Sequence, residues 1–598
     1  MIGMINTANH PHYKWIALSN TTLGVLMATI NQTILIIALP VIFNGLHVNP
    51  LKGGQTGLLL WVLLGFNVAT TILLVTLGRL SDMFGRVRLY NLGFLIFTIG
   101  SVLAALTWSK GTNGEIELII FRIVQGIGGG FLFANSAAIL TDAFPVNQRG
   151  MALGLNQVAA IGGSVIGLLV GGVLAYTGHW RWVFLVNVPI GIAGTIWAYI
   201  ALKEVSRRQQ NQRLDIWGNI TLGVGLLGVM LGLTYGIMPY GSHTMGWSNP
   251  WVLTGLIGGV VVLILFGIIE RYVEQPLFDL SLFRIRAFLF GNISGLLAAL
   301  ARGGLQFMLI IWLQGIYLPL HGVSYADTPL IAGLYTLPQM IGFFLAGPLS
   351  GYLSDRFGAR AFATIGMLIS AVGFYLLETL PVNFNHWVFW VYLFIIGLGM
   401  GLFASPNSAA IMNSLPAKYR GVGSGMRSTF MNAGMMLSMG VFFSIMIAGL
   451  AQKLPNAMST GLMKHGVPAP AAHLVANLPP TSSLFAALLG YNPLQNLLGP
   501  GGANVLAHLP VQQAHYIVGK IFFPTLIGGP FKHGLSLVFT MSLVMSLIAA
   551  AASSLRGKHF INKDEDENTP PVQPTSSDGR VVRLEGRDGG RKPSRTVT

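Results

Sequence analysis

The pattern of hydrophobic and polar positions along the chain is one of long apolar runs separated by short polar loops. A helix needs about 20 apolar residues to cross a hydrocarbon layer of roughly 30 Å, because it rises 1.5 Å per residue. Fourteen runs have this length, at residues 15–43, 56–79, 88–108, 115–140, 150–176, 181–203, 215–239, 250–271, 287–318, 327–351, 361–380, 386–412, 421–450 and 533–556. The pattern therefore predicts an all-α membrane protein with 14 transmembrane helices.

The composition supports this prediction. Of the 598 residues, 53% are hydrophobic and only 9% are charged, whereas a soluble domain carries about 25% charged residues. The chain contains no cysteine, which excludes disulfides, thiol catalysis and cysteine-ligated zinc. The first apolar run is longer than the core of a signal peptide and no small-residue cleavage pattern follows it, so we expect it to remain as a span.

The distribution of Lys and Arg among the short loops predicts the orientation, because cytoplasmic loops carry the excess of these residues. With the N-terminus inside, the inner loops hold Arg79, Arg86, Arg88, Arg149, Lys203, Arg207, Arg208, Arg213, Arg271, Arg284, Arg286, Arg356, Arg360, Lys418 and Arg420. The short outer loops hold only Lys52, Lys110 and Arg181. We therefore expect a multi-pass protein of the cell membrane with both termini in the cytoplasm. The net charge of +16 reflects this bias and a basic tail, so we expect no nucleic-acid partner.

An internal repeat divides the chain. "GRLSDMFGRVR" at 78–88 recurs as "GYLSDRFGAR" at 351–360, and "GIGGGFLFANSAAILTDAFPVNQRG" at 126–150 recurs as "GLGMGLFASPNSAAIMNSLPAKYRG" at 397–421. The offsets are 273, 272 and 271 residues for the pairs Asp82 and Asp355, Asn135 and Asn407, and Arg149 and Arg420. This near-constant spacing predicts two similar six-helix bundles, an architecture typical of transporters whose substrate site lies where the halves meet.

The repeat and the loop lengths predict the domain organisation. We expect a cytoplasmic N-terminus at 1–14, a first six-helix bundle at 15–203, a linker with two extra transmembrane helices at 204–272, and a second six-helix bundle at 273–556. The second bundle carries a long extracellular insertion at 451–532, in which "TSSLFAALLGYNPLQNLLG" looks helical. Residues 557–598 have the composition of a disordered cytoplasmic tail.

Four short stretches carry a family resemblance: "GRLSDMFGRVR" at 78–88, "RIVQG" at 122–126, "WRWVFLVNVPIG" at 180–191 and "PLFDLSLFRIRAF" at 276–288. They resemble the cytoplasmic loop signature, the fourth-helix Arg motif and two further stretches of the 14-helix drug:proton antiporter branch of the major facilitator superfamily. The resemblance covers residues 15–450 and 533–556. It implies the major-facilitator fold, two six-helix bundles plus two extra helices, with a substrate cavity lined by the first and fourth helices of each half.

Two positions depart from that branch. An acidic residue is usual in its first helix ahead of Ala-Leu-Pro, but "INQTILIIALP" places Asn31 there. The fifth-helix motif Gly-x-x-x-Gly-Pro-x-x-Gly-Gly appears as "GSVIGLLVGG", with Leu168 in place of the proline, which removes a bend and weakens the case for antiport. Its glycines remain as an expected helix-packing motif formed by Gly163, Gly167, Gly171 and Gly172.

The repeated loop motif predicts a latch on the cytoplasmic side. Its glycines permit a tight turn and close helix approach, and its carboxylate and arginines can join neighbouring segments. The residues expected in this cytoplasmic gate are Gly78, Asp82, Gly85, Arg86, Arg88, Asp142, Arg149, Asp355, Gly358 and Arg360. The alternative interpretation is that they only set the topology.

No carboxylate or histidine is expected near the middle of a span, although proton relays inside membranes are normally built from Asp, Glu or His. All 19 Asp and Glu residues fall at span ends, in loops or in the tail, so proton coupling would use carboxylates at the rims. The residues at depth are basic instead. Arg302, in "GLLAALARGGLQFMLIIWLQ", has no acidic residue within twenty positions and lies ten residues before Trp312, which we expect at the outer interface.

Arg122 and Arg302 are expected to face the cavity, and Arg427 is another buried charge that can also reach the inner surface. The alternative for the first two is a structural bond to helix carbonyls or polar side chains. The expected cavity residues are Asn31, Gln32, Arg122, Gln125, Arg302, Gln306, Ser405 and Asn407. A cavity with arginines and no carboxylate suits an anionic or zwitterionic amphiphile.

These observations favour a secondary active transporter, namely a proton-coupled exporter of amphipathic organic compounds or drugs. A lipid or glycolipid translocase is an alternative, and a non-transporting receptor or scaffold is an alternative of another class. No Walker sequence, metal-ligand cluster or Ser/His/Asp group is visible, so we expect no ATP drive, no metal, no cofactor and no enzymatic activity. The expected partners are a small-molecule or lipid-like substrate, the proton as coupling ion and the lipid bilayer, and we expect a monomer.

Overall fold

The computed structural model describes residues 12–48, 55–145, 148–204, 215–241, 243, 245–416, 419–499 and 504–557. Within these ranges 14 helices are long and apolar enough to cross a membrane. The isolated bridge between Tyr240 and His243 is the only β-pairing that these residues make. The predicted all-α class with fourteen spans is therefore confirmed.

The helices follow the order that the apolar runs predicted. The first half contains α1 (Tyr13–Gly45), α2 (Gln55–Phe84), α3 (Arg86–Leu106), α4 (Gly111–Ala143), α5 (Arg149–Tyr176), and α6 (Trp182–Leu185) with α7 (Asn187–Ala201) as one span. The extra pair is α8 (Ile216–Gly236) and α9 (Pro250–Ile269). The second half contains η3 (Leu280–Arg284), a ninth span built from α10 (Arg286–Gly303), α11 (Leu305–Trp312), η4 (Leu313–Tyr317) and α12 (Leu318–Leu320), then α13 (Thr328–Phe357), α14 (Ala359–Thr379), α15 (His386–Asn413), α16 (Arg420–Lys464) and α21 (Phe522–Ser554).

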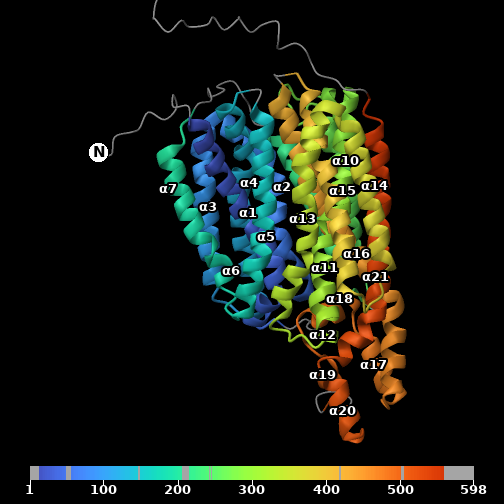
Figure 1. The fold of residues 1–598 in the computed structure, drawn as a ribbon. Helices are drawn as coiled ribbons and strands as arrows, with labels where there is room; N and C mark the ends of the chain where they lie inside the picture. Colours follow the sequence, from blue (N-terminus) through green and yellow to red (C-terminus); the bar gives the residue numbers. More distant parts are fainter. Residues whose placement is uncertain are drawn as a thin grey trace, which may run out of the picture.

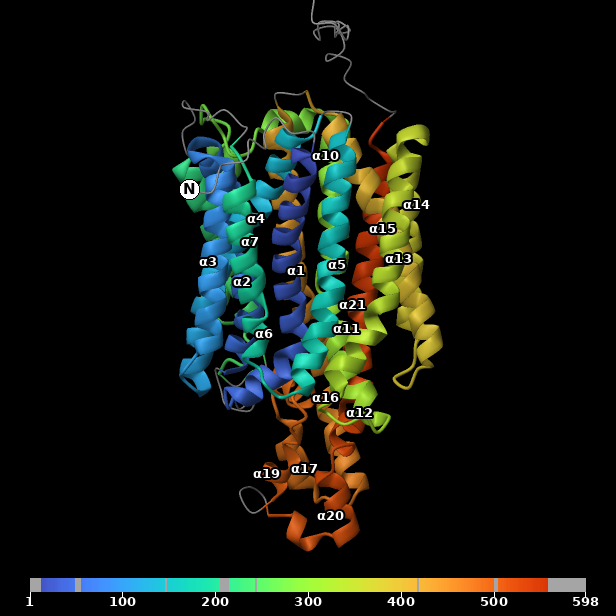
Figure 2. The ribbon, with the colours of Figure 1, turned by 60° about the vertical axis from the view of Figure 1, so that its left-hand side comes forward.

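The spans form two bundles that lie side by side (Figures 1 and 2). In the first bundle α1 packs on α5, and α4 packs on both α2 and α3. In the second bundle α15 packs on α13 and α14, and α21 packs on α10, α14 and α16. The two halves meet where α5 contacts α13 and where α2 contacts α16, and the extra helix α8 packs against both α2 and α16. The extra pair therefore lies at the junction of the halves.

Glycines allow the closest of these helix contacts. The glycines of the expected packing motif on α5 all face other helices: Gly163, Gly167, Gly171 and Gly172. The first three face α1, where an added Cβ would come within 2.0 to 3.0 Å of α1 atoms. Gly172 faces α13, where an added Cβ would lie 2.6 Å from the Cα of Leu330. One helix thus contacts its own bundle and the opposite half through small residues.

The two ends of the bundle differ. We call the end at which α1 begins and α21 ends the terminal face, and the opposite end the insertion face. In Figure 1 α17 (Ala469–Ala476), α19 (Leu494–Leu498) and α20 (Val511–Val518) extend beyond the insertion face. The short η6 (Leu506–His508) lies between the last two in sequence.

The two helices that flank the insertion 451–532 are longer than the spans that the sequence predicted. Helix α16 continues to Lys464 and α21 already begins at Phe522, so only residues 465–521 connect the two helices. Leu454, Met458 and Leu462 recur at every fourth position and are fully buried. An apolar stripe at this spacing stabilises a helix, which explains why α16 does not end at residue 450.

Helix α18 (Pro480–Leu488) of the insertion turns back into the bundle. All of its residues are buried, and it packs against η4, α16 and α2, so that it contacts both halves. The ring of Phe485 lies on Phe443 of α16, with the centroids 5.6 Å apart. Part of the expected extracellular loop is therefore a buried component of the insertion face.

Candidate functional site

The ninth span is interrupted near its middle. Helix α10 ends at Gly303, and Gly303 and Gly304 pack directly against α16. The hydroxyl of Ser438 on α16 accepts the backbone N–H of Gly304 at 2.9 Å and donates to the carbonyl of Leu300. The two glycines therefore allow α16 to insert a hydroxyl into the hydrogen-bond ladder of the span, which is a recognised cause of a helix break.

Arg302 lies in the last turn of α10, directly before this break. Its guanidinium carbon is 5.6 Å from the ring centroid of Phe343 on α13. Within the part of the chain that the structure describes, no carboxylate or hydrogen-bond acceptor pairs with it. The side chain is surrounded by protein atoms and yet partly exposed.

Arg302 lies well inside the ninth span. Trp312, which we expected at the outer interface, is fully buried and packs against the rings of Phe384 and Phe389. The span continues past Trp312 through η4 and α12 to Leu320. Arg302 consequently lies near the middle of the span Arg286–Leu320, where a charge costs at least ~2.5–3.5 kcal/mol unless a cavity or partner accommodates it.

Arg122 is held inside the first bundle and is only 1% exposed. Its Nη1 donates to Gln125 Oε1 at 2.9 Å and its Nε donates to the Val62 carbonyl at 3.3 Å. The ring of Phe66 lies 4.9 Å from the guanidinium carbon, and Gln125 Nε2 donates to Ser101 Oγ at 2.8 Å. These contacts join α2, α3 and α4 and correspond to the structural alternative for Arg122. We therefore leave Arg122 and Gln125 out of the proposed cavity.

Asn31 and Asn407 are also buried within their own bundles, each at most 2% exposed. Asn31 Oδ1 accepts a hydrogen bond from Asn187 Nδ2 at 3.3 Å. Asn407 Oδ1 accepts from Ser294 Oγ at 3.5 Å and from the guanidinium of Arg556. Neither side chain shares a hydrogen bond with Arg302 among the described residues.

Gln32, Gln306 and Ser405 keep partial exposure. Gln32 Nε2 donates to Asn67 Oδ1 at 2.9 Å. Gln306 Nε2 has no hydrogen-bond partner among the described residues, and it lies one turn beyond Arg302. Arg302 and Gln306 are thus neighbouring side chains at the helix break whose donors find no partner among these residues.

Arg427 and Arg556 contact consecutive residues of α15. Arg427 Nη2 donates to Ser408 Oγ at 2.6 Å, and Arg556 Nη2 donates to Ser294 Oγ at 2.6 Å as well as to Asn407. The sequence analysis missed Arg556, because a basic residue after the last apolar run reads as a flanking charge. It is only 4% exposed and folds back into the second bundle.

The first copy of the loop motif forms an ion-pair network at the terminal face. Arg86 Nε lies 2.8 Å from Asp82 Oδ1, and Arg86 Nη1 lies 2.7 Å from Asp142 Oδ2. Glu204, which the sequence analysis did not single out, accepts the backbone N–H of Arg86 at 3.0 Å. The network joins the ends of α2, α3 and α4 to the segment after α7, all within the first half.

Both copies of the motif turn at a glycine. Gly85 has φ 108° and Gly358 has φ 87°, a region of backbone space that side chains other than glycine rarely adopt. Gly78 faces α4, where an added Cβ would lie 3.9 Å from the Cβ of Ala134. Four other residues were expected at this gate. Arg88 and Arg360 are exposed, and the side chains of Arg149 and Asp355 lie outside the described residues.

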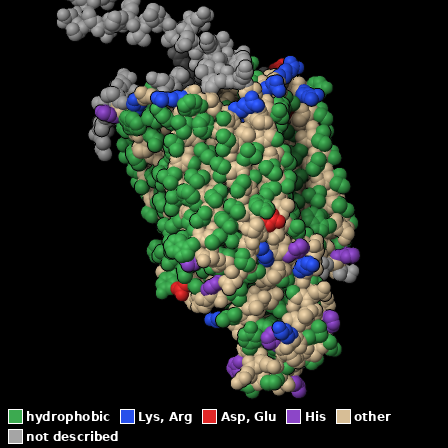
Figure 3. Space-filling model, turned by 45° about the vertical axis from the view of Figure 1, so that its right-hand side comes forward, with side chains coloured by type: hydrophobic (Ala, Val, Ile, Leu, Met, Phe, Trp, Pro, Cys, Tyr) green, Lys and Arg blue, Asp and Glu red, His purple; other side chains and the backbone are tan. Residues whose placement is uncertain are grey.

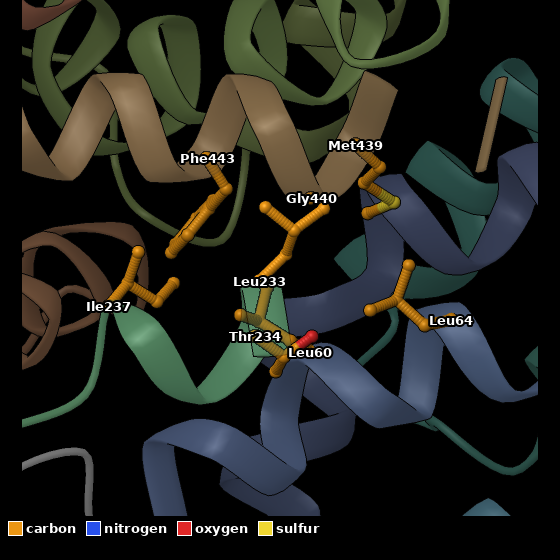
Figure 4. A pocket seen from close by; sticks show the side chains of 8 residues that line it. All are labelled: Leu60, Leu64, Leu233, Thr234, Ile237, Met439, Gly440 and Phe443. Atoms are coloured by element: carbon orange, nitrogen blue, oxygen red, sulfur yellow. The ribbon is translucent and has the colours of Figure 1, made fainter. Parts of the chain in front are cut away.

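The surface and the interior of the bundle are both largely apolar. Hydrophobic side chains cover the flank, whereas Lys and Arg side chains lie along the terminal face and also, together with His side chains, around the insertion (Figure 3). A small cavity of about 10 Å³ lies where α2, the end of α8 and α16 meet (Figure 4). Its lining is Leu60, Leu64, Leu233, Thr234, Ile237, Met439, Gly440 and Phe443. A cavity of this size holds at most one water molecule.

Comparison with known proteins extends these observations. The family model of the Major Facilitator Superfamily matches residues 21–316 and 293–451. The riboflavin transporter RibZ of Clostridioides difficile is 30% identical over 443 residues, which cover 73% of this chain and 89% of that protein. Multidrug resistance protein 3 of Bacillus subtilis is 30% identical over 454 residues, 76% of this chain and 83% of that protein. The tetracenomycin C resistance and export protein of Streptomyces glaucescens is 25% identical over 569 residues, 95% of each chain.

Among solved structures, a bacterial homologue of the human lysosomal transporter Spinster aligns with 92% of this chain and 97% of its own, at 18% identity and a TM-score of 0.49. Two related bundles of membrane-spanning helices, with a charged side chain at a helix break in one of them, define a polytopic membrane carrier. The chain belongs to the major facilitator superfamily. It is a multi-pass membrane transporter whose relatives include multidrug resistance and antibiotic export proteins. Transporters of this family bind small-molecule substrates and usually work as monomers.

Proposed function

We propose that the protein exports amphipathic organic anions or zwitterions and that the proton gradient drives the export. The observation that carries the cargo class is the environment of Arg302. Its guanidinium lies at mid-span, partly exposed, and no described residue neutralises it. Because an unpaired charge inside a membrane protein is costly, an anionic group of the cargo is the natural counter-ion at this position.

The helix break beside Arg302 supports the same location. Discontinuous helices frequently form the substrate sites of secondary transporters. Gln306 adds a donor one turn away that has no partner among the described residues. Relatives named for multidrug resistance and tetracenomycin C export support organic compounds as cargo and export as direction.

We infer that the terminal face is cytoplasmic, so that both chain ends lie inside and the insertion lies outside. The excess of Lys and Arg in the short loops at the terminal face supports this orientation. The relatives are named as transporters of small molecules, which gives no support to the receptor or lipid-translocase alternatives.

The first test is the substitution Arg302→Gln, measured as efflux of paired anionic and cationic amphiphiles from cells that lack other exporters. We expect at least a tenfold loss of resistance to the anionic compounds and a smaller change for the cationic ones. Arg284→Gln removes an exposed arginine of η3 and is the matched control. Collapse of Arg302→Gln abundance, or equal losses for both cargo charges, would contradict the proposal and favour a structural role.

The absence of cysteine provides a second test that does not depend on loss of function. Arg302→Cys introduces the single thiol of the chain. Labelling it with an ethylammonium thiosulfonate restores a positive charge and should restore anion efflux, whereas the ethylsulfonate reagent should not. Leu305→Cys, at a fully buried position three residues away, should remain unlabelled. If Arg302→Cys is inaccessible from both sides of the membrane, it does not line a pathway.

A further inference from the structure

Two carboxylic acids meet at the terminal face, where the extra helix pair begins and ends. Asp215 directly precedes α8 and Glu270 directly follows α9, so both lie one residue outside a membrane-spanning segment. They are 5% and 3% exposed, respectively. Burial of two acids side by side is unusual, because each loses its hydration and each charge repels the other.

Each carboxylate uses one oxygen to hold the backbone. Asp215 Oδ1 accepts the N–H of Gly218 at 2.8 Å and thereby caps α8. Glu270 Oε2 accepts the N–H of Phe278 at 2.9 Å. The other two oxygens, Asp215 Oδ2 and Glu270 Oε1, are buried and receive no donor from the described residues.

These two unused oxygens lie close together beside Gly218. A Cβ at Gly218 would lie 2.3 Å from Asp215 Oδ2 and 2.5 Å from Glu270 Oε1, so the two oxygens are at most about 4.8 Å apart. Two carboxylate oxygens can form a hydrogen bond only if one carries a proton. A single proton between them would satisfy both buried acceptors at once.

We propose that Asp215 and Glu270 share one proton and form a proton-binding site of the transport cycle. The proposal rests on the proposed function in one respect, because it assigns the proton of a proton-driven exporter to a particular pair of residues. It also explains how a carrier without a carboxylate at mid-span uses acids at the rim.

The pair is positioned to transmit a change of protonation to both halves. Glu270 holds Phe278, whose ring contacts Phe266 of α9 at 5.3 Å and Phe430 of α16 at 5.6 Å between centroids. Arg79 of α2 donates to the carbonyl of Gln275 at 2.8 Å and to that of Pro276. The segment 275–278, which leads into the second half, is therefore held by Arg79 from one side and by Glu270 from the other.

Loss of the shared proton would place two negative charges beside each other and beside Arg79. The other charged groups of the flanking segments are engaged or exposed. Asp82 on α2 pairs with Arg86, and Arg271 and Glu274 are exposed. Repulsion between the two carboxylates, and attraction of Arg79 toward them, would loosen the contacts on residues 275–278. The step moves one proton and breaks no covalent bond.

The acidity of the pair agrees with this role. Burial, followed by the interaction with Asp215, raises the pKa of Glu270 to about 8, although the Phe278 N–H and Arg79 oppose the shift. A site with this pKa holds its proton at neutral pH and releases it at mildly alkaline pH. Titration near the working pH is what a proton-coupling site requires.

The direct test is a pH titration of purified full-length protein by infrared spectroscopy of the carbonyl stretch of protonated carboxyl groups. Wild type should lose the signal of one such group with a midpoint between pH 7 and 9. Glu270→Gln and Asp215→Asn should each lack this transition, and Glu274→Gln, an exposed acid four residues away, should retain it. A wild-type protein with no carboxyl titrating in this window would overturn the proposal, whatever the cargo proves to be.

The second test measures cargo efflux from proteoliposomes as a function of internal pH. Glu270→Gln mimics the protonated side chain, so we expect efflux that varies less than twofold between pH 6.5 and 9, whereas wild type should vary at least fivefold. Gly218→Ala, which would push a methyl group between the two oxygens, should shift the infrared midpoint without removing either acid. An unchanged pH profile in Glu270→Gln, with the infrared transition abolished, would show that the pair binds a proton but does not couple it to transport, and would overturn that part of the proposal.

Discussion

The contact between α1 and α5 at Gly167 is so close that a single added methyl group should destabilise the fold. A Cβ at this position would lie 2.0 Å from Thr33 Oγ1 and 2.8 Å from the carbonyl oxygen of Ile30. The Thr33 hydroxyl can rotate away, although it would leave its hydrogen bond to the Thr29 carbonyl at 2.9 Å. The Ile30 carbonyl belongs to the backbone of α1, so it can move only if the helix moves.

The magnitude follows from two opposing effects. Overpacking of a well-packed interior costs about 1–3 kcal/mol, and replacing glycine by alanine inside a helix returns up to about 1 kcal/mol. We therefore expect Gly167→Ala to lose about 1–2 kcal/mol of stability. Gly162→Ala is the matched control, because it lies on the same helix and an added Cβ there meets no atom within 4 Å.

The assay is thermal unfolding of the purified variants in one detergent. Gly167→Ala should unfold at a lower temperature than wild type, and Gly162→Ala at an equal or higher temperature. Adding Thr33→Ala to Gly167→Ala should recover part of the loss, since the hydroxyl contact disappears while the contact with Ile30 remains. If Gly167→Ala and Gly162→Ala are equally stable, the close approach of α1 and α5 is not a determinant of stability.

Three further changes test other contacts. Ser438→Ala leaves the buried N–H of Gly304 without its acceptor, so we expect thermal unfolding to show a loss of about 1–3 kcal/mol of stability. Ser438→Thr keeps the hydroxyl and should retain stability. Equal stability of the two variants would exclude the hydroxyl as the cap of the break. Asp142→Asn removes one of the two ion pairs of Arg86. Because both side chains are partly exposed, we expect stability to fall by no more than about 1 kcal/mol, and by less at high salt. A loss of stability that does not depend on salt would point to packing instead. The pKa of Glu270 is raised from 4.5 to about 8 in the fold, so the folded protein keeps a proton that the unfolded chain has released. Stability should therefore fall as the pH rises from about 5 to 8. The fall should be smaller in Glu270→Gln, and an unchanged fall in that variant would assign the pH dependence to another group.

The arrangement of spans was predictable because hydrophobic length is a local property. Each apolar run contains the information that makes it a membrane helix, and the repeat of Asp82 at Asp355 shows the duplication without any structural knowledge. The resemblance to the major facilitator superfamily was confirmed by the family model and by the relatives. Helix α16 is longer than the predicted thirteenth span, because burial against the core, rather than hydropathy alone, continues the helix to Lys464.

The partners of the polar residues were not predictable to the same extent. Arg122 and Arg302 look alike in sequence, each followed by a glutamine on the same helix face, yet one is enclosed by hydrogen bonds and the other has none among the described residues. Ser438 lies within a run of small and apolar residues, and nothing local distinguishes it from other serines. Its role depends on the two glycines more than 130 positions earlier that allow α16 to approach.

The sequence by itself determined that this chain is a duplicated helical membrane protein, how many times it crosses the bilayer and that its deep charges are arginines. Those properties follow from the free energy of moving each segment out of water, which depends on neighbours in the chain. Only the tertiary structure decided that α18 fills the insertion face, that Arg302 stands unpaired at a helix break and that Asp215 meets Glu270. These outcomes depend on which distant side chains come into contact, because the free energy of a buried charge depends on the groups around it in space.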